Sequence, residues 1–159
     1  KRVRDEIIAL ARAGLTVIAD SRCNIGEYTD CILKPNEVEC WRAVYNNEGY
    51  ADAGYDEFIE AAKLLAKKNR STVFCTLGKR GSAVTDGNVA EAVEAVLYKG
   101  EIDICGAGDT SLSAFSAALA AKADFKTAAE FASLASGVTV RKIGVTGTAS
   151  PEEIEALAK

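Results

Sequence analysis

Histidine and methionine are both absent from this chain of 159 residues. Without histidine, neither a Ser-His-Asp triad nor a Cys-His pair can form within the chain, which excludes these two kinds of nucleophilic catalysis. Proton transfer must therefore use a carboxylate, lysine, tyrosine or cysteine side chain, and an aspartate is the best-placed candidate. Because the chain starts at Lys1 and contains no methionine, we expect a fragment or a processed piece rather than a complete gene product.

Strong positive charge, long apolar runs and paired cysteines are also missing. The formal net charge is −4 and no basic tract exceeds Lys67-Lys68 with Arg70 nearby, so we expect no nucleic-acid partner. No apolar run is long enough to span a bilayer and no signal peptide is visible, so we expect no membrane partner. The cysteines are odd in number and lack a C-x-x-C pair, which favours reduced, mostly buried thiols in a cytoplasmic protein over a zinc site or disulfide framework. They are Cys23, Cys31, Cys40, Cys75 and Cys105.

What is present is typical of one globular α/β domain. Apolar residues make up 48% of the chain and charged residues 26%. Apolar spacing and capping signals predict helices over residues 3–13, 36–44, 56–68, 108–121 and 126–141, and one starting at Pro151. Short β-branched runs predict strands over residues 15–19, 31–33, 72–77 and 82–85. Residues 89–98 have helical propensity but a position that also allows extended chain. The alternation predicts a mainly parallel sheet.

Residues 103–110, Asp-Ile-Cys-Gly-Ala-Gly-Asp-Thr, open a helix rich in small residues. Gly106 and Gly108 free the backbone to turn and expose successive N–H groups, and the helix dipole adds positive potential there. Asp109 places a carboxylate at the mouth of this anion site, a combination that suggests phosphoryl transfer to a hydroxyl. Taken alone, such an aspartate is commonly only a helix cap. Ser111 at the third small position disfavours a dinucleotide fingerprint, and no Walker A sequence occurs.

Two further motifs precede this segment. Residues 76–81, Thr-Leu-Gly-Lys-Arg-Gly, end a predicted strand in a glycine-bounded turn that leaves room for a nucleotide, although for this segment alone a plain hairpin turn is the stronger explanation. Lys79 or Arg80 could meet phosphate there or lie in solvent. In residues 34–39, Asn36 and Glu39 fall on one face of a helix start, where an amide and a carboxylate could hold water around Mg²⁺. A simple capping box is the alternative.

In this order and spacing, the three motifs resemble those of the PfkB (ribokinase-like) carbohydrate kinases. The C-terminal half of that family carries N-x-x-E, T-L-G-x-x-G and D-x-x-G-A-G-D ahead of an alanine-rich helix. The resemblance covers nearly the whole chain and implies a three-layer Rossmann-like ribokinase fold whose N-terminal half is absent. Residues 1–159 would then be the C-terminal ATP-binding and catalytic part. Segments 19–22, 134–144 and 150–153 look similar to the heptose-phosphate kinases of ADP-heptose biosynthesis.

The resemblance implies a role for each matching residue. Asp109 matches the base that accepts the proton of the acceptor hydroxyl, and the Gly106, Ala107 and Gly108 backbone matches the anion hole. The position of Asp103 is one that helps to bind potassium in some family members. The pair that organises Mg²⁺, mostly through water, matches Asn36 and Glu39. The nucleotide-binding positions match Lys34, Thr76, Gly78, Gly81, Val140 and Gly144.

The expected activity is ATP-dependent phosphoryl transfer to a hydroxyl of a sugar or sugar phosphate such as heptose 7-phosphate. ATP and Mg²⁺ are the implied cofactors, with K⁺ in some members. Three alternatives stay open: another PfkB sugar kinase such as a ribokinase or fructokinase, a nucleotide-binding or regulatory module without kinase activity, and a nicotinamide-dependent oxidoreductase, which Ser111 disfavours. The sheet edge left by the absent half is a candidate surface for self-association into a homodimer.

Overall fold

The computed structural model describes residues 2–159, which form two compact units. Unit 1 holds the residues up to Gly78 together with Ala83–Ala92, and unit 2 holds Lys79–Ser82 and Val93–Lys159. Each unit is described by itself. Across residues 2–159, no helix has both the length and the apolar character needed to cross a membrane. The single catalytic part expected over residues 1–159 stays a prediction.

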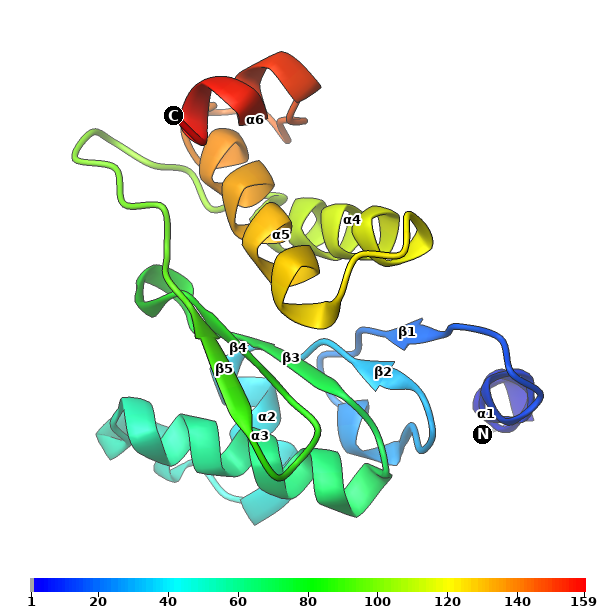
Figure 1. The fold of residues 1–159 in the computed structure, drawn as a ribbon. Helices are drawn as coiled ribbons and strands as arrows, with labels where there is room; N and C mark the ends of the chain where they lie inside the picture. Colours follow the sequence, from blue (N-terminus) through cyan, green and yellow to red (C-terminus); the bar gives the residue numbers. More distant parts are fainter. Residues whose placement is uncertain (1) are drawn as a thin grey trace. The chain divides into compact units, whose positions relative to one another are not determined.

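A five-stranded sheet in the order β1-β2-β3-β4-β5 organises unit 1 (Figure 1). Strands β1, β2 and β3 run parallel, with Ile18 opposite Ile32 and Leu33 opposite Val73. The short turn over residues 86–89 joins β4 to its neighbour β5, which makes these two strands an antiparallel hairpin. The expected α/β fold is therefore confirmed, with the parallel part in β1–β3. The strands are β1 (Ile18–Ala19), β2 (Ile32–Leu33), β3 (Val73–Thr76), β4 (Ser82–Thr85) and β5 (Ala90–Val93).

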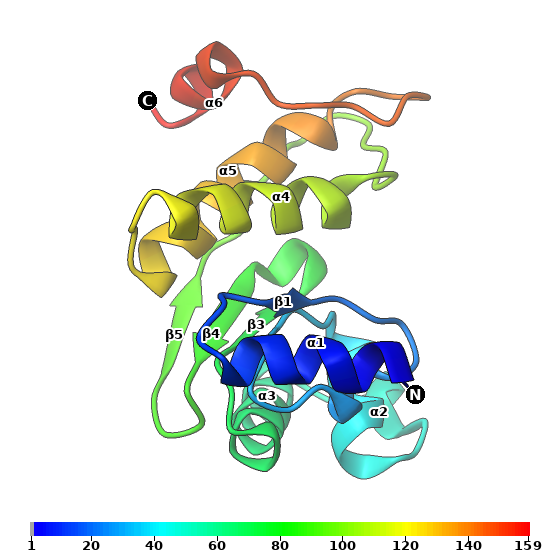
Figure 2. The ribbon, with the colours of Figure 1, turned by 90° about the vertical axis from the view of Figure 1, so that its right-hand side faces the viewer.

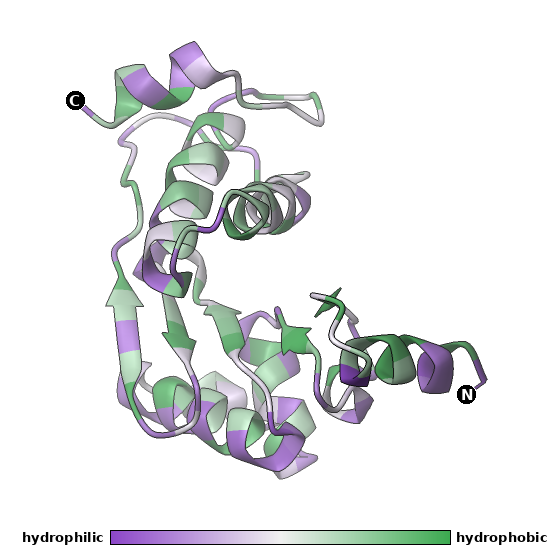
Figure 3. Ribbon diagram, turned by 45° about the vertical axis from the view of Figure 1, so that its right-hand side comes forward, coloured by the Kyte–Doolittle hydropathy of each residue, from purple (hydrophilic) through white to green (hydrophobic). Residues whose placement is uncertain are grey.

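Helices α1 (Arg2–Arg12), α2 (Glu37–Tyr45) and α3 (Tyr55–Asn69) complete unit 1, at the positions that the sequence predicts. Helices α2 and α3 lie on the same face of the sheet (Figure 2). The buried face of α3 includes Phe58 and Leu65, which belong to a core that the sheet residues Leu33 and Val73 share. Hydrophobic residues dominate β3, whereas α3 mixes hydrophobic and hydrophilic residues along its length (Figure 3). Burial of one face against the sheet explains this pattern.

Unit 2 is a helical hairpin of α4 (Ala107–Ala120) and α5 (Phe125–Thr139) with the short helix α6 (Pro151–Leu157) against α5. Small residues let α4 and α5 approach closely, because Ala128, Ala132 and Ala135 are all buried on α5. At Gly137 an added Cβ would meet Val96 Cβ at 2.9 Å and Leu157 Cδ2 at 3.3 Å, so glycine is needed where Val96 packs against α5. The cap at Ser150, followed by Pro151, starts α6 as predicted.

The cysteines match the expectation of free, mostly buried thiols. All five are free, and Cys31, Cys40 and Cys75 are buried in unit 1. Cys23 and Cys105 are exposed. Burial raises the pKa of the Cys31 thiol, and a hydrogen bond with Cys40 together with burial raises that of Cys75. The thiols of Cys31 and Cys75 therefore stay protonated and act as small apolar core residues.

Candidate functional site

In unit 1, the motif over residues 34–39 lies beside Thr76, where the motif over residues 76–81 begins, at the carboxyl ends of β2 and β3. Asn36 forms a parallel bridge with Thr76, and the Thr76 amide donates a hydrogen bond to the Pro35 carbonyl at 3.0 Å. The carboxyl ends of parallel strands meet at one edge of a sheet, where ligands of open α/β folds bind. The structure thus brings Lys34, Asn36 and Thr76 together.

Asn36 and Glu39 form a reciprocal capping box at the start of α2. The Glu39 amide donates to Asn36 Oδ1 at 2.8 Å, and the Asn36 amide donates to Glu39 Oε2 at 2.9 Å. Glu39 Oε1, by contrast, has no hydrogen-bond partner anywhere in residues 2–159. The cap therefore fixes the orientation of the carboxylate and still leaves one oxygen for a metal-bound water. The capping and metal-binding interpretations of this pair are compatible.

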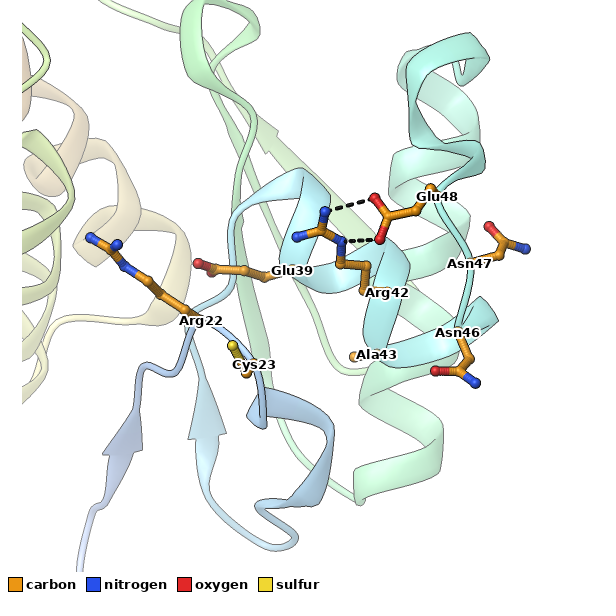
Figure 4. Close-up of a pocket in the computed structure, with 8 residues that line it drawn as sticks. All are labelled: Arg22, Cys23, Glu39, Arg42, Ala43, Asn46, Asn47 and Glu48. Atoms are coloured by element: carbon orange, nitrogen blue, oxygen red, sulfur yellow. Dashed lines mark hydrogen bonds and ion pairs between the residues drawn. The ribbon is translucent and has the colours of Figure 1, made fainter.

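Glu39 is also one wall of a pocket of about 270 Å³ that lies entirely in unit 1 (Figure 4). Arg42, on the same helix, is neutralised by Glu48 through two bonds of 2.9 and 2.6 Å between guanidinium and carboxylate. The Arg42 guanidinium accordingly lowers the pKa of Glu48. Arg22, on the loop after β1, is the other arginine of the pocket. It has no ion-pair partner among the described pocket residues.

The other predicted residues of unit 1 are Lys34 and Gly78. Lys34 is 4% exposed, and its Nζ lies 3.0 Å from Asp20 Oδ2. Gly78 begins the 3₁₀ turn Gly78–Arg80 with φ of +57°, a left-handed conformation that favours glycine. No sequence motif points to a function for Asp20, although an acidic residue directly after a buried strand is a signal that could have found it.

In unit 2, the loop before α4 has the geometry of an anion-binding turn. Gly106 is the N-cap of α4, with φ of +78°, and an added Cβ there would meet Thr146 Cγ2 at 2.7 Å. The Ala107 amide donates to the Ile104 carbonyl at 3.1 Å. The amides of Gly108 and Asp109 belong to the first helical turn, where no intrahelical carbonyl can accept them. Those two N–H groups, with the helix dipole, are the donors that an anion would meet.

Asp103 clamps this loop to the segment after α5. Its Oδ1 accepts from the Cys105 amide at 2.9 Å and its Oδ2 from the Gly144 amide at 3.0 Å. Its own amide donates to the Val140 carbonyl at 2.8 Å. The bonds from Cys105 and Gly144 lower the pKa of Asp103, which is therefore charged at neutral pH. Three predicted residues, Asp103, Val140 and Gly144, are thus brought together directly behind the turn.

Replacing Asp103 with alanine should loosen the loop before α4. Two backbone amides lose their charged acceptor, so hydrogen exchange at Cys105 and Gly144 should accelerate roughly 10-fold or more. In the wild-type protein the clamp is fully formed above the ordinary aspartate pKa of about 4 and is lost as pH falls through the lowered pKa. Hydrogen exchange measured by mass spectrometry or NMR checks this.

A matched control for this substitution is Asp86→Ala. Asp86 Oδ1 also accepts two amides, from Asn88 at 2.8 Å and Val89 at 3.2 Å, but in the turn between β4 and β5. This control should accelerate exchange in its own turn and leave the amides of Cys105 and Gly144 unchanged. Unchanged exchange at those two amides in the Asp103 variant would show that the carboxylate does not hold the loop.

The remaining predicted residues are Gly81 and Asp109, both in unit 2. Gly81 has φ of +89°, and an added Cβ would lie 2.0 Å from the Val93 carbonyl oxygen, so close packing alone requires glycine there. The Asp109 side chain is exposed in the first turn of α4. Thr146, which the sequence analysis does not single out, lies against the turn, with its Oγ1 3.7 Å from Cys105 Sγ.

Comparison with known proteins gives a consistent result. The model of the pfkB family carbohydrate kinases matches residues 22–153. The bifunctional protein HldE of Shewanella baltica (strain OS185) is 33% identical over 156 residues, which are 96% of this chain and 32% of that protein. The protein of the same name from a Nitratiruptor species is 32% identical over 151 residues, covering 92% of this chain and 30% of that protein. The chain thus spans about a third of the length of these relatives.

Solved structures confirm the expected ribokinase-like fold. Arabidopsis thaliana ribokinase, complexed with ribose and ATP, superposes with a TM-score of 0.81 at 24% identity, covering 98% of this chain and 53% of that one. Escherichia coli phosphofructokinase-2 in complex with potassium gives a TM-score of 0.79 at 22% identity, with coverage of 98% and 53%. At these identities the likeness concerns the fold.

Proposed function

Since the chain belongs to the pfkB family of carbohydrate kinases, we propose that it transfers the γ-phosphoryl group of ATP to a hydroxyl of a sugar or sugar phosphate. Asp109 accepts the hydroxyl proton as the new oxygen–phosphorus bond forms. The turn over residues 106–108 and the first turn of α4 stabilise the charge on the phosphoryl group. The observation that carries the proposal is the left-handed Gly106 turn, clamped by Asp103, with Asp109 in the turn that follows.

The nucleotide side of the proposal rests on unit 1. Lys34, Thr76 and Gly78 gather at the carboxyl ends of β2 and β3, and the free Glu39 oxygen suits a hydrated Mg²⁺, which binds one or two carboxylates together with substrate phosphates. In unit 2, Gly81, Val140 and Gly144 are proposed on the nucleotide side from the family resemblance. Asp103 can still offer a lone pair to K⁺ because each of its oxygens accepts only one amide.

The proposed acceptor is a sugar phosphate, with heptose 7-phosphate favoured by the segments that look similar to the heptose-phosphate kinases. Incubation with Mg-ATP and a panel of heptose, hexose and pentose phosphates tests this. ADP formation that depends on one acceptor supports the kinase and names the sugar. Binding of ATP without any transfer would instead favour the regulatory module, and binding of NAD but not ATP would favour the oxidoreductase.

Self-association through β1, the terminal strand of the sheet, is a separate proposal that sedimentation tests.

Glu39→Gln should weaken the apparent affinity for Mg²⁺ roughly 10-fold when it is measured as the metal dependence of ATP binding. A glutamine oxygen can still accept the Asn36 amide, so α2 keeps its cap while the negative charge is lost. Glu57→Gln is the matched control, because Glu57 Oε2 caps α3 in the same way, accepting the Gly54 amide at 2.6 Å. Equal metal dependence in both variants would remove Glu39 from the metal site.

A further inference from the structure

The ion pair of Lys34 with Asp20 joins the carboxyl ends of two neighbouring strands. Asp20 directly follows β1 and Lys34 directly follows β2, and the Lys34 amide also donates to the Ala19 carbonyl at 2.9 Å. The side chain of Lys34 is 5% exposed and that of Asp20 is 32% exposed. Backbone and side chain together therefore fix where the ammonium group sits.

A buried ammonium group needs a compensating charge. Removal of lysine from water is costly, and an unpaired buried charge strongly destabilises a fold. Asp20 supplies the opposite charge at 3.0 Å but uses only one of the three N–H donors of the ammonium. It is also the only hydrogen-bond partner that Lys34 Nζ has within residues 2–159. Two donors remain for a ligand.

The surroundings of this pair belong to the proposed nucleotide site. Lys34 lies two residues before Asn36, which pairs with Thr76 across the strand ends. Lysine binds phosphate as a point charge, so the position of its ammonium decides the strength of the contact. A carboxylate that fixes this position from behind, while remaining half-buried itself, would act on phosphate binding without touching the phosphate.

We infer that Asp20 is a positioning residue, which holds the Lys34 ammonium in place for the phosphates of the nucleotide. This inference rests on the proposed function, because it takes the nucleotide site of unit 1 as its premise. A purely structural ion pair is the competing explanation. The two differ in one respect: a positioning residue acts on phosphate binding only through Lys34, whereas a structural residue acts regardless of it.

A double-mutant cycle on the full chain tests the inference. The four proteins are the wild type, Asp20→Asn, Lys34→Met and the double variant, and calorimetry gives their affinities for Mg-ATP and for adenosine, which has no phosphates. Asp20→Asn should lower the ratio of ATP to adenosine affinity about 10-fold. The same substitution should change this ratio less than about twofold once Lys34 is methionine. Asp52→Asn removes an exposed carboxylate of unit 1 and serves as the control.

The outcomes distinguish failure of the proposed function from failure of the inference about Asp20. If the wild type does not bind Mg-ATP, the proposed function fails and the inference fails with it. If the wild type binds but Asp20→Asn keeps its affinity ratio, or if the loss persists without Lys34, only the inference is overturned. Should Asp20→Asn fail to fold, comparison of Lys34→Met with the double variant still decides, because neither buries an unpaired ammonium. Asp20→Glu, which keeps the charge, should then retain more ATP affinity than Lys34→Met.

Discussion

Replacement of Asp109 with asparagine should lower the turnover number for phosphoryl transfer by about three orders of magnitude and change the dissociation constant for Mg-ATP less than about twofold. Asparagine fits the first turn of α4 as well as aspartate does but cannot accept the hydroxyl proton. The loss should therefore fall on the chemical step rather than on nucleotide binding. Steady-state kinetics with the best acceptor, together with calorimetry for Mg-ATP, separate the two quantities.

The control for Asp109 is Asp56→Asn, which removes an exposed carboxylate from the first turn of α3. It alters the charge at a helix start in the same way and should retain wild-type turnover. If the Asp109 variant turns over at a rate near that of the wild type, Asp109 is not the base. A parallel loss in both variants would instead point to a general charge effect.

Replacement of Gly106 with alanine should lower kcat/KM about 100-fold, because small displacements of donor groups have effects of this size. The residue has φ of +78°, which strains any L side chain, and the new Cβ would lie 2.7 Å from Thr146 Cγ2. The turn must therefore shift and carry with it the amides that we propose as donors to the phosphoryl group. Kinetics with the same acceptor measure the loss.

Two further variants separate the contact from the strain. Gly14 has φ of +97° with nothing within 4 Å of an added Cβ, so Gly14→Ala carries similar strain without a clash and should keep its activity. Addition of Thr146→Ser to the Gly106 variant removes the methyl group that clashes and should restore roughly 10-fold of the lost activity. Full activity of Gly106→Ala would contradict the assignment of the turn as the anion site.

Local signals explain why some elements could be predicted. The capping boxes at Asn36 and Ser150 depend on residues three apart, and both helices begin where the sequence predicts. Residues 89–98 show the limit of local signals. Their propensity is helical, yet residues 90–93 pair with β4 as strand β5, because the sheet offers backbone partners that an isolated segment lacks.

The site residues also divide into features that the sequence predicts and contacts that only the fold creates. Family motifs pointed to Asp103 and Gly106, but not to what these residues contact. The Asp103 clamp joins residues 41 apart in sequence, and the Lys34–Asp20 pair joins residues 14 apart. The fold creates both contacts, which have no local sequence pattern. The bond from the Ala107 amide to Ile104, which leaves Gly108 and Asp109 as the proposed anion donors, is likewise a property of the backbone path.

The measurement that tests the central claim most directly follows the γ-phosphate of labelled ATP in the presence of Mg²⁺ and the acceptor panel. Our account predicts that the wild-type chain moves the label onto a sugar hydroxyl, in a reaction that Asp109→Asn abolishes. The claim is contradicted if the chain binds Mg-ATP and the label stays on ATP with every acceptor, or if Asp109→Asn transfers it at the wild-type rate.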